Sequence, residues 1–135
     1  LLILEDPLAE DDWRGWQMIT EKMGREVHIV GDDLLVTNPA RLDKAIAERA
    51  CTAILIKPNQ IGTLSETMAV IKKARKADFK IIVSHRSGET NDTFIADMAV
   101  GVSADYVKFG APARGERIAK YNRLLEIERQ LGVTP

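Results

Sequence analysis

Short apolar runs alternate with amphipathic stretches along the chain, and this alternation limits the possible folds more than any other feature. The runs are continuous and rich in Ile, Leu and Val, as is typical of parallel strands covered on both faces. We predict strands at Leu1–Leu4, Val27–Val30, Ala53–Ile56, Ile81–Val83 and Tyr106–Phe109. Helical patterns occupy Asp12–Met23, Pro39–Ala50, Leu64–Ala77, Thr93–Val102 and Glu116–Leu131. The alternation predicts an α/β fold of about five βα units with parallel strands and outer helices.

Two helix starts carry recognisable capping signals. Asn38 precedes Pro39, which places a capping side chain before a proline at the first helical position. Thr63 and Glu66 have the spacing of a capping box. Both signals support the predicted boundaries of these helices.

Polar residues stand at the carboxyl ends of the predicted strands. They are Glu5, Asp32, Lys57, His85 and Lys108. In a parallel sheet or barrel these strand ends face the same side, so two carboxylates, two amines and an imidazole are expected at one rim. A single charge at a strand end usually lies in a solvated loop, but five in register indicate a site.

The charge balance argues against nucleic-acid and membrane partners. The 135 residues contain 19 Lys plus Arg and 20 Asp plus Glu, for a formal net charge of -1, so no broad basic field is available to neutralise phosphates. The longest apolar runs, Leu1–Leu4 and Ala53–Ile56, are far shorter than the roughly 18 residues that span a bilayer.

A lone cysteine, Cys51, and the lack of a signal peptide favour a reducing cytoplasm.

The rim residues favour metal-assisted proton abstraction. Glu5 and Asp32 are hard oxygen ligands of the kind that hold Mg²⁺. Their neighbours Asp6 and Asp33 fit turn or capping carboxylates better than ligands. Lys57 follows a buried strand, where desolvation and nearby cations favour a neutral amine that can act as a base. A charged Lys108 would instead stabilise a developing anion.

The segment Ser84–Thr90 concentrates hydrogen-bond donors ahead of a predicted helix. It contains hydroxyls, an imidazole, a guanidinium and a glycine, which suit a phosphate. An ordinary polar turn with a helix cap near Asn91 or Asp92 is about as good an explanation. Taken with the rim residues, the phosphate interpretation predicts proton abstraction beside a carboxylate on a phosphorylated substrate.

These motifs resemble the C-terminal part of the enolase family. The resemblance is carried in the family's order by Glu5–Trp13, Gly31–Leu34, Thr37–Pro39, Lys57–Thr63, Ser84–Thr90, Lys108–Pro112 and Glu116–Asn122. It covers essentially the whole chain and is highly specific. It implies the Mg²⁺-dependent, reversible dehydration of 2-phosphoglycerate to phosphoenolpyruvate in glycolysis and gluconeogenesis.

The resemblance also implies a role for each matching residue. Glu5 and Asp32 correspond to Mg²⁺ ligands, and Lys57 to the base that removes the C2 proton. Among the substrate-binding positions, His85 contacts the substrate, Arg86 and Ser87 bind its phosphate, and Lys108 contacts its carboxylate.

The resemblance implies an eight-stranded TIM-like barrel, of which residues 1–135 would be the last five strands in a single, incomplete domain. A third metal-binding aspartate, the acid that protonates the leaving hydroxyl and an N-terminal domain would precede Leu1. We therefore expect the 135 residues alone to be inactive, and the full-length protein to be a homo-oligomer. The absence of an initiator Met agrees with this expectation.

Two alternatives remain from the sequence. A five-unit doubly wound module of the receiver or flavodoxin type fits the length, and Asp32–Asp33 with Lys108 resemble a phosphoacceptor site. In receivers, however, the acidic pair follows the first strand, whereas here a full βα unit precedes it. An enolase-like scaffold without a catalytic role is the other alternative.

Residues outside these motifs have structural explanations. We expect Trp13 and Trp16 to pack in a core or interface, and His28 to be a partly buried strand residue. Cys51 fits a small structural position, and the basic cluster Lys72–Lys76 fits a solvated helix face.

Overall fold

Strands and helices alternate along the chain as the sequence predicts. The computed structural model describes residues 1–132, and the chain divides into two compact units, Leu1–Ile82 and Val83–Pro135. Its strands are β1 (Ile3–Glu5), β2 (His28–Gly31), β3 (Ala53–Ile56), β4 (Lys80–Ser84) and β5 (Tyr106–Lys108). Its helices are α1 (Trp13–Met23), α2 (Pro39–Glu48), α3 (Pro58–Ile61), α4 (Leu64–Lys76), α5 (Phe94–Gly101) and α6 (Gly115–Gln130).

The strands form one sheet in the order β1-β2-β3-β4-β5. The pairs β1–β2 and β2–β3 are parallel, with Glu5 opposite Val30 and Gly31 opposite Ile54. Each strand therefore pairs with its neighbour in the chain. A doubly wound module would have the order 2-1-3-4-5, so the receiver or flavodoxin alternative is wrong.

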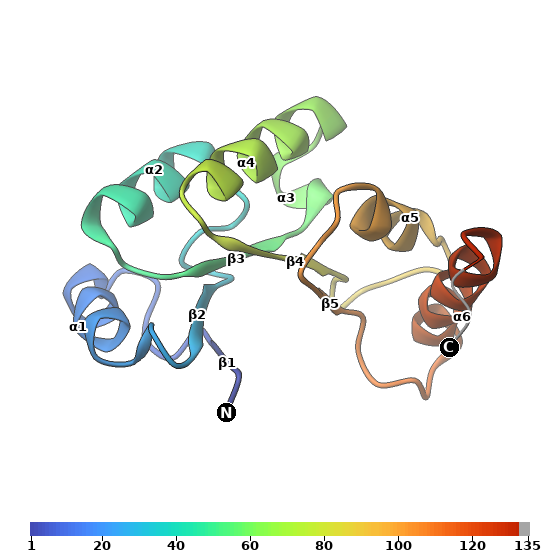
Figure 1. Cartoon of the computed structure of the whole chain (residues 1–135), viewed down its shortest axis with the longest axis horizontal. Helices are drawn as coiled ribbons and strands as arrows, with labels where there is room; N and C mark the ends of the chain where they lie inside the picture. Colours follow the sequence, from blue (N-terminus) through green and yellow to red (C-terminus); the bar gives the residue numbers. More distant parts are fainter. Residues whose placement is uncertain (133–135) are drawn as a thin grey trace. The chain divides into compact units, whose positions relative to one another are not determined.

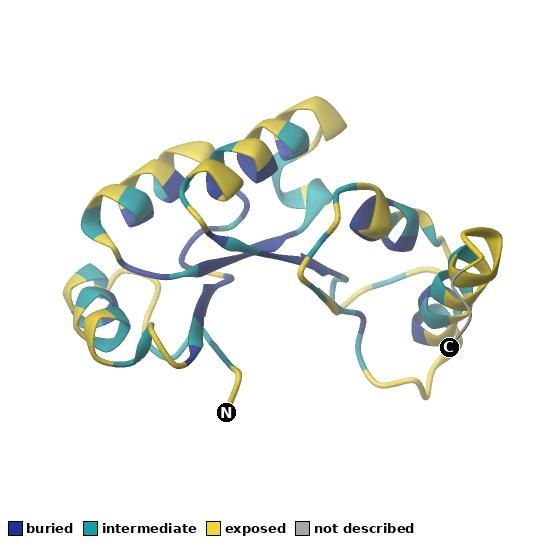
Figure 2. Cartoon of the chain, viewed as in Figure 1, coloured by how far each residue is buried: buried dark blue, intermediate teal, exposed yellow. Residues whose placement is uncertain are grey.

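Burial of β2 and β3 forms the core of the first unit. All four residues of β3 are buried, and so are three of the four in β2. In Figure 1, α2 and α4 lie side by side over these strands, and Figure 2 shows that their strand-facing sides are buried while their outer sides are exposed. Leu42 and Ala45 from α2, with Val70 and Ala74 from α4, contribute that buried face.

The second unit pairs the end of β4 with β5. The backbone N–H of His85, which follows β4, donates to the carbonyl of Lys108 at 2.9 Å. The helices α5 and α6 pack against each other. Phe109 is fully buried, and its ring meets that of Tyr121 edge-on at a centroid distance of 6.0 Å.

The capping predictions are confirmed. Asn38 accepts hydrogen bonds from the N–H groups of Ala40 and Arg41 at 2.9 and 3.1 Å. The hydroxyl of Thr63 accepts from the N–H of Glu66 at 3.2 Å and donates to the Glu66 carboxylate at 2.5 Å.

The predicted boundaries are wrong at several places. The first strand is shifted and includes Glu5, and α2 ends at Glu48 because Arg49 adopts a left-handed backbone with φ 53°. The short helix α3 was not predicted. Its single turn begins at Pro58 and is closed by Gly62, which has φ 107° and donates its N–H to the Pro58 carbonyl at 2.8 Å.

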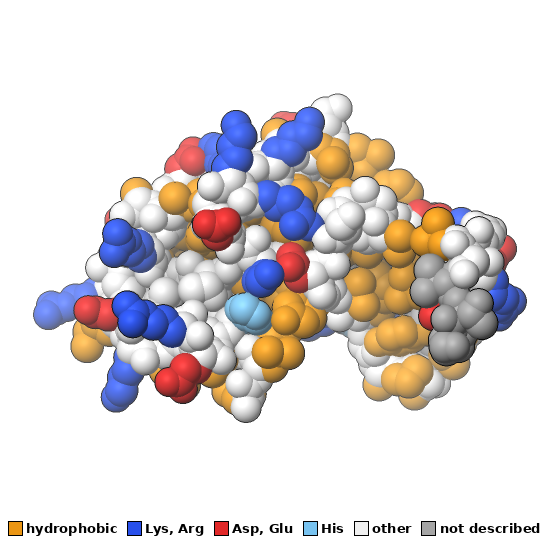
Figure 3. Space-filling model, viewed as in Figure 1, with side chains coloured by type: hydrophobic (Ala, Val, Ile, Leu, Met, Phe, Trp, Pro, Cys, Tyr) orange, Lys and Arg blue, Asp and Glu red, His pale blue; other side chains and the backbone are white. Residues whose placement is uncertain are grey.

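The surface of the first unit carries interspersed acidic and basic side chains, as Figure 3 shows. This agrees with the nearly neutral composition. Among residues 1–132, none of the helices combines the length and apolarity needed to cross a bilayer.

The two open edges of the sheet lead us to expect that the 135-residue chain self-associates. In the described chain, β1 and β5 each have a strand on one side only, and Leu1 and Leu2 beside β1 are 85% and 57% exposed. Because open edges with apolar flanks template further pairing, sedimentation velocity should detect oligomers. Leu1→Lys with Leu2→Lys should reduce them, whereas Met18→Lys on the exposed face of α1 should not. A compact monomer that unfolds in two states would contradict this prediction.

Candidate active site

Three of the predicted site residues come together at the strand ends of the first unit. Glu5 is the last residue of β1, Asp32 follows β2 and Lys57 follows β3. Carboxylate oxygens of Glu5, Asp6 and Asp32 lie within 4.8 Å of one another. Parallel pairing of consecutive strands explains this proximity, because it brings their carboxyl ends to one edge.

Lys57 forms a close ion pair with Asp32. Its Nζ lies 2.6 Å from each of the two Asp32 carboxylate oxygens. The side chains are only 12% and 9% exposed, so solvent screens the pair weakly. Lys57 therefore faces the carboxylate cluster rather than the helices.

Asp6 holds the turn after β2 in place. Its two carboxylate oxygens accept the backbone N–H groups of Asp32 and Asp33, each at 2.9 Å. This is the capping behaviour predicted for Asp6, and it fixes the start of the segment that carries Asp32. Asp33 itself lies outside the carboxylate cluster.

Thr37 supports Lys57 and was not identified from the sequence. Its buried hydroxyl accepts the backbone N–H of Lys57 at 3.0 Å and donates to the side-chain oxygen of Gln60 at 2.8 Å. Thr37 and its neighbour Val36 have φ of 54° and 44°, which are unusual for β-branched residues. The sequence analysis included Thr37 in the family motif Thr37–Pro39 but gave it no role, and interpreted only Asn38 and Pro39 as a helix start.

The carboxylate cluster has the chemistry of a divalent cation site. Glu5, Asp6 and Asp32 offer hard oxygen donors within reach of one ion. Three carboxylates gathered this closely favour a counter-charge such as a divalent cation. The residues present therefore fit a metal such as Mg²⁺.

The remaining predicted site residues lie in the second unit. His85, Arg86 and Ser87 follow β4 directly, and Lys108 is the last residue of β5. His85 and Arg86 are partly buried and Ser87 is exposed. The carbonyl oxygens of Arg86 and Ser87 accept hydrogen bonds from Arg117 at 2.8 and 2.9 Å. The Arg117 guanidinium thus holds the backbone of this loop.

Two buried cations on α6 anchor this loop, and the sequence analysis gave them no role. Arg117 is 6% exposed, and Lys120 is 1% exposed. The Lys120 ammonium donates to the carbonyls of Thr90 and Asp92 at 2.9 Å and of Glu116 at 3.0 Å. The sequence pattern of α6 does not reveal this role. The helix buries its charged residues and exposes Ile118 and Leu125, whereas most surface helices bury their apolar residues.

Arg117 also determines the protonation state of His85. Its Nη1 lies 2.6 Å from His85 Nδ1, and since a guanidinium has donors only, Nδ1 must accept and His85 must be neutral with its proton on Nε2. Burial, the Arg117 charge and the Lys108 charge all lower the pKa of His85 below 6.5. His85 can therefore offer an N–H donor at neutral pH.

The residues with structural explanations behave largely as expected. Trp16 is fully buried and donates its indole N–H to the Ala9 carbonyl at 2.9 Å. Trp13 lies under the cations of Arg41 and Lys44, at 5.4 and 4.1 Å from the ring centroid. Burial raises the pKa of the Cys51 thiol to about 12, which excludes a reactive thiolate.

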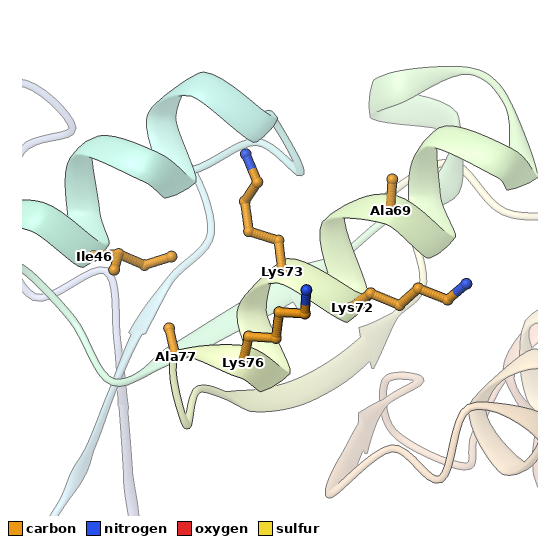
Figure 4. A pocket seen from close by; sticks show the side chains of 6 residues that line it. All are labelled: Ile46, Ala69, Lys72, Lys73, Lys76 and Ala77. Atoms are coloured by element: carbon orange, nitrogen blue, oxygen red, sulfur yellow. The ribbon is translucent and has the colours of Figure 1, made fainter.

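The basic cluster Lys72–Lys76 lines a hollow whose lining includes none of the residues Glu5, Asp6 and Asp32. This hollow of about 570 Å³ lies between α2 and α4 and is lined by Ile46, Ala69, Lys72, Lys73, Lys76 and Ala77. Figure 4 shows Lys73 reaching toward α2, where it pairs with Asp43 at 2.6 Å. Lys72 and Lys76 are exposed, as predicted for a solvated face, whereas Ala74 is buried.

Comparison with known proteins places these groups in context. A family profile described as "Enolase, C-terminal TIM barrel domain" matches residues 1–135. The chain is 57% identical over 132 residues to an enolase of Elusimicrobium minutum (strain Pei191), covering 98% of this chain and 31% of that protein. It is 54% identical over 132 residues to an enolase of Solanum lycopersicum, covering 98% and 30%. The chain thus spans about a third of the length of these relatives.

The lowered pKa of His85 predicts that the stability of the chain depends on pH. A depressed pKa means that the unfolded chain binds the proton more readily, so the free energy of unfolding should fall as pH drops below about 6.5. The midpoint of the His85 ring resonances in an NMR titration should lie below 6.5, and Arg117→Met should raise it. The chain has two histidines, and the ring resonances that disappear in the variant His28→Gln are those of His28. An unchanged midpoint in Arg117→Met would contradict the contact between the two side chains.

Proposed function

Because the chain belongs to the family of enolase C-terminal TIM barrel domains, we propose that it forms the part of an enolase that carries the base, two metal ligands and some of the substrate-binding residues. In this proposal residues 1–135 are a single, incomplete barrel domain. The observation that carries the proposal is the grouping of Glu5, Asp32 and Lys57, with Lys57 Nζ 2.6 Å from Asp32.

The proposed reaction is the reversible dehydration of 2-phosphoglycerate to phosphoenolpyruvate. The C2 proton of the substrate is weakly acidic because it lies beside a carboxylate, so its removal needs a positioned base and stabilisation of the extra negative charge. Glu5 and Asp32 would hold Mg²⁺. The bound metal would supply the positive charge that acidifies the C2 proton and stabilises the resulting anion.

Lys57 is the proposed base for the C2 proton. An ammonium cannot accept a proton, so Lys57 acts only as a neutral amine, in which its charge-assisted contact with Asp32 is lost. The carboxylate of Asp32 then becomes available to a metal ion. The Asp32–Lys57 ion pair and the reactive arrangement are therefore alternative states of the same two side chains.

The second unit would supply the groups that bind the substrate. Arg86 and Ser87 would bind the phosphate, since a guanidinium and a hydroxyl are effective donors to phosphate oxygens. His85 would donate a hydrogen bond from its Nε2–H to the substrate, and the ammonium of Lys108 would contact the substrate carboxylate. These roles rest on the match to the family's motifs, and the neutral state of His85 supports a donor role.

The wider setting of the proposal follows the relatives. They are about three times as long as this chain, so the remaining catalytic groups, including the acid for the leaving hydroxyl, would come from outside the 135 residues. We further propose a homo-oligomeric assembly and a cytoplasmic location for the complete enzyme.

The proposal predicts activity only in a completed protein. A chimera in which this chain replaces the matching segment of the Elusimicrobium minutum enolase should form phosphoenolpyruvate from 2-phosphoglycerate, measured by its absorbance at saturating Mg²⁺. The 135-residue chain alone should give no detectable product, because the acid that protonates the leaving hydroxyl would come from outside these residues. An inactive but folded chimera, or robust turnover by the chain alone, would refute the proposal.

The base assignment predicts a selective effect of Lys57→Ala in the same chimera. Turnover should fall to the detection limit, since a general base contributes about 10²- to 10⁴-fold, while substrate binding should change much less because the base acts mainly in the transition state. Lys76→Ala, which removes an exposed lysine of α4, is the matched control and should retain activity. Near-normal turnover by Lys57→Ala would exclude Lys57 as the base.

A further inference from the structure

One buried guanidinium holds three consecutive residues of the loop after β4. Nη1 of Arg117 contacts His85 Nδ1 at 2.6 Å and the Arg86 carbonyl at 2.8 Å, while Nη2 donates to the Ser87 carbonyl at 2.9 Å. These are the three residues of the loop to which the proposed function gives substrate contacts. Arg117 itself comes from α6, about 30 positions later in the chain.

We propose that Arg117 is a positioning residue that fixes His85, Arg86 and Ser87 in the conformation that binds the substrate phosphate. This inference rests on the proposed function and deepens it. Arg117 acts through the loop and does not itself contact the substrate.

The loop has no regular secondary structure of its own, so side-chain contacts determine its conformation. Residues 85–93 lie outside the helices and strands, and Ser87, Gly88 and Thr90 are exposed. A planar guanidinium binds several acceptors at fixed angles, whereas an ammonium acts as a compact point charge. Arg117 can therefore set the orientation of the segment as well as its location.

The packing around Arg117 is specific for this arrangement. Gly110 has φ 80°, and a Cβ at this position would lie 2.9 Å from His85 Cε1 and 3.2 Å from Arg117 Cδ. The Gly110 carbonyl in turn accepts the Tyr121 hydroxyl from α6. Backbone conformation and a missing side chain thus make room for the His85–Arg117 contact.

Lys120 performs a separate task one helical turn later. It binds the carbonyls of Thr90 and Asp92, beyond the residues to which substrate contacts are assigned. The two cations therefore divide the loop, with Arg117 ordering the binding segment and Lys120 anchoring the connection to α5.

A positioning role and a purely structural role predict different kinetics. If Arg117 only stabilised the fold, its loss would reduce the fraction of active molecules and lower the apparent kcat without changing KM. If it positions a phosphate-binding segment, KM should rise because binding is weakened in the ground state and the transition state alike. Inorganic phosphate, as a competitive inhibitor, reports on the same segment directly.

The test uses Arg117→Met and Arg117→Lys in the chimera with the Elusimicrobium minutum enolase. We expect Arg117→Met to raise KM for 2-phosphoglycerate and the inhibition constant of inorganic phosphate about tenfold or more, with a smaller change in kcat. Arg117→Lys keeps the buried charge but loses the planar fork, so it should fold and show an intermediate rise in both constants. Arg123→Met is the matched control, because Arg123 lies on the same helix but pairs with Asp97 and Glu126 instead of the loop. It should leave both constants unchanged.

Other results separate the two proposals. If the parent chimera turns over substrate and both Arg117 variants keep its KM and phosphate inhibition constant, the positioning role is refuted and the proposed function stands. If the folded parent chimera is inactive, the proposed function fails, and calorimetric binding of inorganic phosphate still decides whether Arg117 positions the loop. Failure of both Arg117 variants to fold would assign Arg117 a structural role and refute the inference.

Discussion

Parallel pairing of strands in chain order places every proposed functional side chain of this protein. Glu5, Asp32 and Lys57 are separated by whole βα units, yet their charged groups meet because β1, β2 and β3 pair in sequence with aligned carboxyl ends. The buried strands supply the rigidity, while the residues just beyond them supply the chemistry. The same principle operates in the second unit, where His85 and Lys108 stand at the ends of paired strands.

Charged side chains hold the backbone in both units, but with opposite charges. In the first unit a carboxylate accepts backbone N–H groups, and in the second unit cations donate to backbone carbonyls. In the first unit, Asp32 of the carboxylate cluster pairs with the Lys57 ammonium, and the oxygens of Asp6 accept backbone N–H groups. In the second, Arg117 and Lys120 are buried beneath carbonyl oxygens of a loop. Each arrangement satisfies buried polar groups, since among residues 1–132 no buried side-chain nitrogen or oxygen lacks a hydrogen-bond partner. A negatively charged site and a positively charged loop support are thus built from one repeating architecture.

The sequence predicts the existence and order of the strands and the polar residues near their carboxyl ends, because both follow from local patterns, although several strand boundaries are shifted. Continuous apolar runs identified β2 and β3, and Asn38 and Thr63 identified helix starts through capping chemistry. The supporting residues could not be predicted in this way. Thr37 reaches Lys57 across 20 positions, and Arg117 reaches His85 across 32, so their roles depend on tertiary structure. The α6 helix was misleading because its buried face carries cations where apolar residues are the norm.

The backbone of Val36 and Thr37 has a cost that the rest of the first unit must offset. Left-handed conformations in β-branched residues store about 1–3 kcal/mol each, and here they orient the hydroxyl that holds the Lys57 backbone. Replacement of Val36 by glycine would relieve this strain, but it would also increase the freedom of the unfolded backbone and remove the half-buried Val36 side chain. The same change would loosen the segment that holds the Lys57 backbone. The bend at Val36 and Thr37 thus exchanges intrinsic backbone stability for a fixed position of the Lys57 backbone.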